Sequence, residues 1–162
     1  MAVKEEIPFE NFLAEVSPQY VEFVTNLHDY LLTNGCKLKI ETAKNGYVVS
    51  YSYAKTKRVF MNFVFRKSGL IARIYGDNVN KYIDFMQTLP AEMNKAIDKA
   101  PICKRLLDPT ACNSRCSMGY AFEIGGNTYL KCKYNCFMFG VNDENIPFIK
   151  TFIENEIKER NK

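Results

Sequence analysis

Residues 37–75 read KLKIETAKNGYVVSYSYAKTKRVFMNFVFRKSGLIARIY, and this stretch decides the fold class. Apolar and polar side chains alternate in four runs, as they do in strands that bury one face. Turn residues separate the runs: Asn45-Gly46 is typical of a tight hairpin, and Lys67-Ser68-Gly69 ends the third run. The stretch therefore predicts an antiparallel four-stranded meander with one buried face.

Helical patterns flank this meander. Pro18 follows Ser17, which is typical of a helix start, and apolar residues then recur every three or four positions as far as Leu31. After the meander we expect short helices over 79–86 and 90–97, a β-hairpin over 120–132 and a closing helix from about 146. The fold class is therefore α+β, with helices on one face of the sheet. We expect a single domain over 1–162, with a helix–sheet–helix core in 1–100 and a cysteine-bearing hairpin and closing helix in 101–162.

The composition is that of an ordinary globular chain, with 47% hydrophobic and 25% charged residues. No apolar run approaches the roughly 18 residues that a transmembrane helix needs. The opening residues, MAVKEE, are followed by no apolar stretch of the kind that a signal peptide carries. We therefore expect a cytoplasmic protein that does not act in a membrane.

Charge is distributed unevenly along the chain. Residues 1–35 carry one basic and six acidic side chains, whereas residues 36–75 carry nine basic and one acidic. This asymmetry is typical of a surface for an anionic partner, but also of the ordinary solvated face of a sheet. If Leu38, Ile40, Val59, Met61 and Phe63 face the helices, the opposite face carries Lys37, Lys39, Ser50, Ser52, Arg58, Phe60, Asn62, Arg66, Arg73 and Tyr75.

This opposite face is the first candidate site. An anionic small molecule or an acidic protein partner would suit its cations and hydroxyl groups. We do not expect nucleic acid, because surfaces that stack bases usually present more aromatic side chains. No pattern in the sequence indicates an oligomeric state. The predicted ligand-binding residues are Lys39, Arg58, Phe60, Arg66, Arg73 and Tyr75.

The second candidate site is a group of cysteines. Cys112 and Cys116 form one pair with three residues between them, and Cys132 and Cys136 form another. Two such pairs predict a structural zinc site with four thiolate ligands, although two intervening residues are the commoner spacing. Three alternatives stay open: cysteines packed as small hydrophobic residues, a thiol-based redox protein or sensor that uses the segment Cys103–Cys136, and an iron–sulfur cluster.

Other catalytic chemistry has little support. His28 is the only histidine, and we expect it on the buried side of the first long helix, where it would be structural. No phosphate-binding loop or dinucleotide motif is present. We therefore expect a binding module and not an enzyme, with a metal-free small-molecule-binding domain as a further alternative.

The order of helix, antiparallel strands and returning helices resembles the small frataxin-like α+β domains of bacterial proteins, the YdhG-like and YjbR-like groups. The segments that carry the resemblance are Gly46–Val49, Lys57–Phe60 and Gly69–Ile74, within residues 17–100. The resemblance implies a compact cytoplasmic domain that in some members handles iron or binds ligands. This chain lacks an acidic ridge that would hold iron, and it adds the segment from Cys103 to Cys136, so no functional residue carries over.

Overall fold

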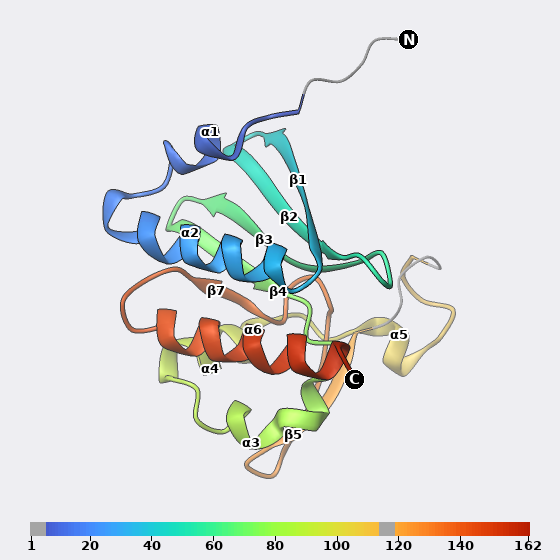
Figure 1. Ribbon diagram of the computed structural model, residues 1–162. Coiled ribbons are helices and arrows are strands. Elements are labelled where there is room, and N and C mark those ends of the chain that lie inside the picture. Colours follow the sequence, from blue (N-terminus) through green and yellow to red (C-terminus); the bar gives the residue numbers. More distant parts are fainter. Residues whose placement is uncertain (1–5, 114–118) are drawn as a thin grey trace. The chain divides into compact units, whose positions relative to one another are not determined.

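The computed structural model describes residues 6–113 and 119–162 (Figure 1). The chain divides into two compact units. Unit 1 comprises residues 1–72 and 140–142, and unit 2 comprises residues 73–139 and 143–162. The boundary therefore lies inside the fourth strand, whereas the sequence suggested a division into sub-parts near residue 100.

Unit 1 contains the predicted meander and the helices that precede it. The strands are paired in chain order as antiparallel neighbours, and Gly46 adopts a φ of 105° at the first turn, a conformation that favours glycine. The α+β prediction is thus confirmed. The elements are α1 (Phe9–Leu13), α2 (Pro18–Thr33), β1 (Cys36–Ala43), β2 (Gly46–Tyr53), β3 (Arg58–Arg66) and β4 (Gly69–Ile74).

The core of unit 1 lies between the two helices and one face of the sheet. Figure 1 shows α2, in blue, running along that face. The rings of Phe12 and Phe63 stack at 5.8 Å between their centroids, and His28 Nδ1 lies 2.8 Å from the Tyr51 hydroxyl. Phe63 and Met61 are fully buried, as the alternation predicted. The helix-facing side of the sheet therefore packs against α1 and α2 and forms the core of unit 1.

A β-bulge interrupts the alternation in β3. Met61 pairs with Tyr51 and Val59 pairs with Ser52, so Phe60 is an extra residue between the two pairs. A bulge of this kind reverses the side-chain alternation on one side of itself. The expectation that Val59 faces the helices is therefore wrong: it shares the face of Ser52, and 37% of it is exposed.

Unit 2 is built from shorter elements. The predicted β-hairpin and closing helix are confirmed. The main sheet has five strands where the predicted meander has four, and its strand order is β1-β2-β3-β4-β7. Backbone hydrogen bonds of 2.9 Å flank the fifth strand: Ile74 N donates to Phe137 O before it, and Val141 N donates to Leu70 O after it. The elements of unit 2 are η1 (Val79–Tyr82), α3 (Ile83–Met86), α4 (Ala91–Lys99), α5 (Lys104–Leu107), β5 (Tyr120–Ile124), β6 (Asn127–Lys131), α6 (Ile146–Arg160) and the first two residues of β7 (Met138–Gly140).

Phe152 of α6 is the centre of an aromatic cluster in unit 2. Its fully buried ring contacts Phe137 at 5.0 Å, Tyr82 at 5.7 Å, and Phe85 and Phe139 at 6.1 Å. Edge-to-face and tilted contacts at these separations are favourable for aromatic rings. The cluster joins α6 to two other segments, residues 82–85 and 137–139.

A buried ionic network lies beside this cluster. The Glu156 carboxylate is fully buried and accepts hydrogen bonds from the Asn78 backbone at 3.0 Å, the Tyr82 hydroxyl at 2.6 Å and Arg160 Nε at 2.8 Å. Arg160 Nη2 also donates to the Tyr75 carbonyl at 2.8 Å. A buried carboxylate needs such partners, because an unpaired buried charge is costly. The network fixes α6 against residues 75–82.

Within the residues that the structure describes, none of the helices has both the length and the apolar character to cross a membrane.

Candidate functional site

The strand register places a row of polar side chains on the face of unit 1 that points away from α1 and α2. Lys37 is paired with Ser52, and Lys39 with Ser50. Directly paired residues in an antiparallel sheet share a face and lie about 5 Å apart. We call these four residues the Lys–Ser face. Ser50 in turn pairs with Asn62 of β3, which is buried.

The two lysines of the Lys–Ser face differ in their surroundings. Lys39 Nζ lies 2.8 Å from Glu41 on the same strand, and this bond to Glu41 raises the pKa of Lys39. The Lys37 side chain is exposed and makes no hydrogen bond or ion pair with the described residues. The serines are half-buried, so their hydroxyl groups remain within reach of a ligand. Within the described part of the chain, the face thus offers one cation, Lys37, whose side chain has no partner, and one, Lys39, that is paired with a carboxylate.

The two other cations predicted in unit 1 lie apart from this row. Arg58 is exposed, but the bulge pairs it with Tyr53, whose side chain belongs to the buried, helix-facing side. Arg66 is exposed at the end of β3, and its Nη1 donates to the neighbouring Phe65 carbonyl at 3.3 Å. Of the predicted cations of unit 1, Lys39 therefore has the position that the alternation assigned to it, and Arg58 does not.

The predicted aromatic residues are not exposed. Phe60 is fully buried at the bulge. Tyr75 is also buried, in unit 2, where Lys133 Nζ lies 5.7 Å from its ring centroid. Arg73, also in unit 2, is half-buried, and its Nη2 lies 3.9 Å from Met138 Sδ. These side chains serve packing within their own units, so neither ring is available for a ligand in this conformation.

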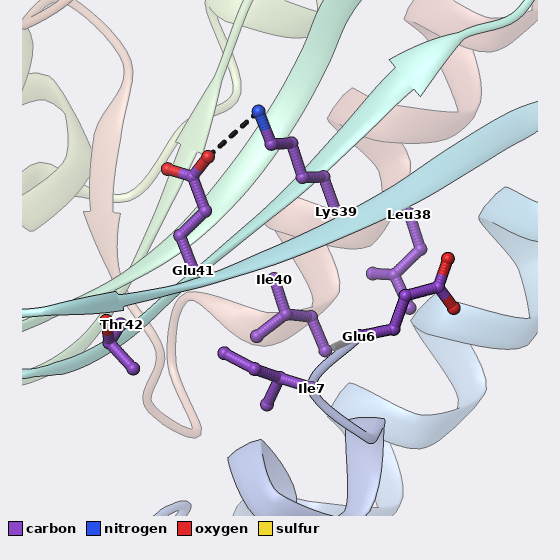
Figure 2. Close-up of a pocket in the computed structure, with 7 residues that line it drawn as sticks. All are labelled: Glu6, Ile7, Leu38, Lys39, Ile40, Glu41 and Thr42. Atoms are coloured by element: carbon purple, nitrogen blue, oxygen red, sulfur yellow. Dashed lines mark ion pairs between the residues drawn. The ribbon is translucent and has the colours of Figure 1, made fainter. Parts of the chain in front are cut away.

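A cavity lies along β1, which is an edge strand of the sheet (Figure 2). Its volume is about 500 Å³. Figure 2 shows Ile7 beside Ile40 on one side of the strand, with Lys39 and Glu41 joined by an ion pair on the other side. Its lining residues are Glu6, Ile7, Leu38, Lys39, Ile40, Glu41 and Thr42.

One predicted cysteine pair lies on a single turn of chain. The Cys136 backbone N–H donates to the Cys132 carbonyl at 3.0 Å, and Asn135 Nδ2 lies 3.5 Å from Cys132 Sγ. Cys132 is half-buried and Cys136 is fully buried. Burial raises the pKa of the Cys136 thiol, so this thiol is protonated at neutral pH in the metal-free protein.

The other predicted cysteine pair is described only in part. Cys112 is exposed, with a φ of 63°, and Cys116 lies outside the described residues. In residues 6–113 and 119–162, no three histidine, cysteine, aspartate or glutamate side chains gather as metal ligands would. The structure therefore does not bring Cys112 together with Cys132 and Cys136, and the predicted zinc site stays a prediction.

Cys103, a fourth described cysteine of this region, has a structural environment. Its sulfur accepts a hydrogen bond from the Gly119 backbone N–H at 3.2 Å. A Cβ on Gly119 would lie 2.0 Å from the Lys131 carbonyl oxygen and 2.8 Å from the Cys103 Cβ, so no larger residue fits there without movement. Close packing thus accounts for both residues.

His28 is structural, as expected. Besides its bond to Tyr51, its ring stacks on Phe9 with 3.8 Å between centroids and 11° between planes. Burial lowers the pKa of His28, while Asp29 and Glu10 act in the opposite direction. The neutral ring is therefore a packed part of the core of unit 1.

Sequence reasoning missed Glu41 and the cavity beside it. A signal for Glu41 was present, since alternation places it two residues from Lys39 on the same face. The cavity had no such signal, because it depends on where residues 6 and 7 lie.

In comparisons with known proteins, no family model, no curated protein and no solved structure matches this chain, so the frataxin-like resemblance also stays a prediction.

Proposed function

We propose that this protein is a binding module whose Lys–Ser face receives an acidic segment of a protein partner. The observation that carries the proposal is the register, which aligns Lys37 with Ser52 and Lys39 with Ser50 on the face opposite the helices. Lysine ammonium groups and serine hydroxyl groups can both donate hydrogen bonds to carboxylates.

The charge of the surrounding chain supports an anionic partner. Residues 36–75 carry nine basic side chains and one acidic. Several of the basic residues lie in the turns at the ends of the strands, including Lys44, Lys55 and Lys67, all of them exposed. A field of one sign of this kind steers an oppositely charged partner and speeds its association.

The shape of the site favours an extended partner over a small molecule. Sites for small molecules are usually concave and mainly apolar. One cavity lies along the edge strand and another, of about 570 Å³, lies along α4, and neither is lined by Ser50 or Ser52. An acidic peptide can instead lie across neighbouring strands and reach the lysines and the serines together.

The test is the binding of a fluorescein-labelled glutamate-rich peptide, followed by fluorescence anisotropy at two salt concentrations. Lys37→Glu reverses the unpartnered cation, and we expect roughly tenfold weaker binding, since like charges placed together at an interface are unfavourable. The matched control is Lys95→Glu on α4, which changes the net charge equally and should bind as wild type. Equal loss in both variants would show that only the net charge matters.

A second variant tests the hydroxyl groups. Ser50→Ala with Ser52→Ala leaves the charge unchanged and should weaken peptide binding about three- to tenfold, the loss of one or two hydrogen bonds. Melting curves should confirm that the fold is intact. Unchanged binding would remove the serines from the site. Stabilisation by a small polyanion, without peptide binding, would instead favour a small-molecule ligand.

A structural zinc ion in unit 2 is the second proposal, with ligands Cys112, Cys116, Cys132 and Cys136. The Cys132–Cys136 turn supports it, because zinc loops present two thiolates from one short turn. Binding would deprotonate the buried Cys136 thiol and release its proton. Lys131 and Lys133 flank Cys132 and would offset part of the charge of the thiolates.

Metal content and thiol reactivity on the same native sample test this second proposal. We expect one zinc ion per chain and protected thiols, with loss of the metal in Cys132→Ser but not in Cys36→Ser, which changes a buried cysteine of unit 1. Rapidly alkylated thiols without metal would favour the redox alternative. Slowly alkylated thiols without metal would leave the cysteines as packing residues.

A further inference from the structure

The outer edge of β1 is a second surface of unit 1, and it shares Lys39 with the Lys–Ser face. In the sheet order β1-β2-β3-β4-β7, β1 lies at one end, so β2 is its only strand neighbour among the described residues. All eight of its residues pair with β2 in one continuous register, without a bulge. Such an edge is a template for a further strand.

We propose that a second copy of this chain pairs with this edge, and that the protein forms a two-fold dimer through antiparallel β1 strands. The sequence of β1 selects the register. If Ile40 lies opposite Ile40 of the partner subunit, Lys39 lies opposite Glu41 of the partner subunit, and the reciprocal pair forms as well. Both ion pairs then lie on the same side of the joined sheet, because directly opposite residues share a face.

Neighbouring registers place like charges opposite each other. A shift by two residues in one direction places Lys39 opposite the partner's Lys39, although it also pairs Lys37 with the partner's Glu41, and in the other direction it places Glu41 opposite the partner's Glu41. Like charges directly opposite each other are destabilising, whereas opposite charges contribute favourably. Of these registers, the Ile40-centred one pairs opposite charges without placing like charges directly opposite each other.

The groups that would form these ion pairs are accessible in the single chain. The Lys39 and Glu41 side chains are 73% and 51% exposed, and they already adopt a 2.8 Å ion pair with each other. Pairing of two copies exchanges two intrachain ion pairs, one in each chain, for two ion pairs between the chains. Because both groups are exposed beforehand, the exchange requires no buried charge to move.

The opposite side of the strand provides apolar contacts. Leu38 and Ile40 are half-buried and line the 500 Å³ cavity together with Ile7 (Figure 2). In the proposed register the partner's Ile40 lies directly opposite Ile40, at a Cβ separation of about 5 Å. Burial of these side chains supplies the hydrophobic contribution that ion pairs on an exposed face do not give.

This inference does not depend on the proposed function, because it uses the edge of β1 and not the binding of an acidic partner. The alternative is that the charges on β1 protect the edge from association, as charged residues often do. The two cases differ in how charge reversal acts. If the charges protect the edge, the wild type and every charge variant should be monomeric. If the charges are complementary between two copies, the wild type should dimerise, reversal of one charge should break the dimer, and reversal of both charges should restore it.

Sedimentation velocity of the full chain over about a hundredfold range of concentration tests the pairing. The wild type should form a dimer. Lys39→Glu alone and Glu41→Lys alone should each weaken association at least tenfold, since each places like charges opposite one another twice. An equimolar mixture of the two variants should associate again, because their charges are complementary. The double variant with both changes should also dimerise.

A second measurement fixes the register. Ile40→Cys should give a disulfide-linked dimer on mild oxidation, identified by mass spectrometry as a link between the two introduced cysteines. Thr42→Cys is the matched control, since position 42 lies opposite the partner's Leu38 and should not link to itself. A wild type that is monomeric over the whole range, or single charge variants that associate as the wild type does, would overturn the inference.

Discussion

The two units of this protein are stabilised in different ways. Unit 1 has long strands, and its buried polar side chains include His28, which is bonded to Tyr51, and Asn62. Unit 2 has mostly short elements that an aromatic cluster and a buried ionic network hold together. The charged side chains that the structure describes in unit 1 lie at its surface, whereas in unit 2 the Glu156 and Arg160 side chains are buried.

This difference separates a candidate binding surface from a structural scaffold. Exposed charges such as Lys37 contribute little to stability and are available for a partner. Buried charges such as Glu156 are already fully engaged and are costly to disturb. Substitutions in unit 2 should therefore alter stability, and substitutions on the face of unit 1 should alter binding.

The largest expected effect is in the aromatic cluster. Phe152→Ala removes a fully buried ring with four aromatic neighbours, and it should lower the free energy of unfolding by about 3–5 kcal/mol. Urea denaturation followed by circular dichroism would measure the change. Phe85→Ala is the control, because this ring contacts Phe152 but is half-buried, and its effect should be clearly smaller. Equal effects would contradict a core centred on Phe152.

The ionic network should give the next largest effect. Glu156→Gln keeps the size of the side chain but removes the closer of two carboxylate partners of the Arg160 guanidinium, whose side chain is 6% exposed, and leaves Asp77 at 3.3 Å. We expect a loss of about 2–3 kcal/mol, the range for hydrogen bonds to charged groups. Glu154→Gln, on the exposed side of the same helix, should change stability by less than about 0.5 kcal/mol. A neutral result at Glu156 would mean that the network contributes little.

A smaller effect concerns pH and unit 1. Above pH 6.5 His28 is neutral in both the folded and the unfolded states. As the pH falls below 6.5, the unfolded chain takes up a proton while the folded chain resists it, because burial lowers the pKa of His28. Stability should therefore fall between pH 6.5 and the lowered pKa. His28→Gln should flatten this slope in denaturation curves at pH 7.5 to 5.5, and an unchanged slope would assign it to other groups.

The sequence was sufficient for the architecture of unit 1 because period-two alternation and turn residues are local signals. Strands β1 to β4 and helix α2 all lie where these signals placed them. The bulge at Phe60 was not predictable in the same way, because residues 59–61 and 63–65 are runs of apolar residues that fit either face of the sheet. One extra residue was enough to place Arg58 and Val59 on the faces opposite to those expected.

Unit 2 was less predictable because its contacts are long-range. Nothing in the spacing of Glu156 and Asn78, 78 residues apart, indicates that they meet. The fifth strand is three residues long and carries no periodic pattern of its own. The cysteine spacing did indicate a pair on one turn at Cys132 and Cys136, but the approach of a second pair depends on tertiary structure and not on spacing.

Chemical-shift mapping tests the division between binding surface and scaffold most directly. Amide spectra of the ¹⁵N-labelled protein would be recorded while a glutamate-rich peptide is added. The account predicts saturable shifts centred on Lys37, Lys39, Ser50 and Ser52, with α6 and the β5–β6 hairpin unaffected. Shifts centred on Lys131 and Lys133 in unit 2, or no saturable shift at any amide, would contradict it.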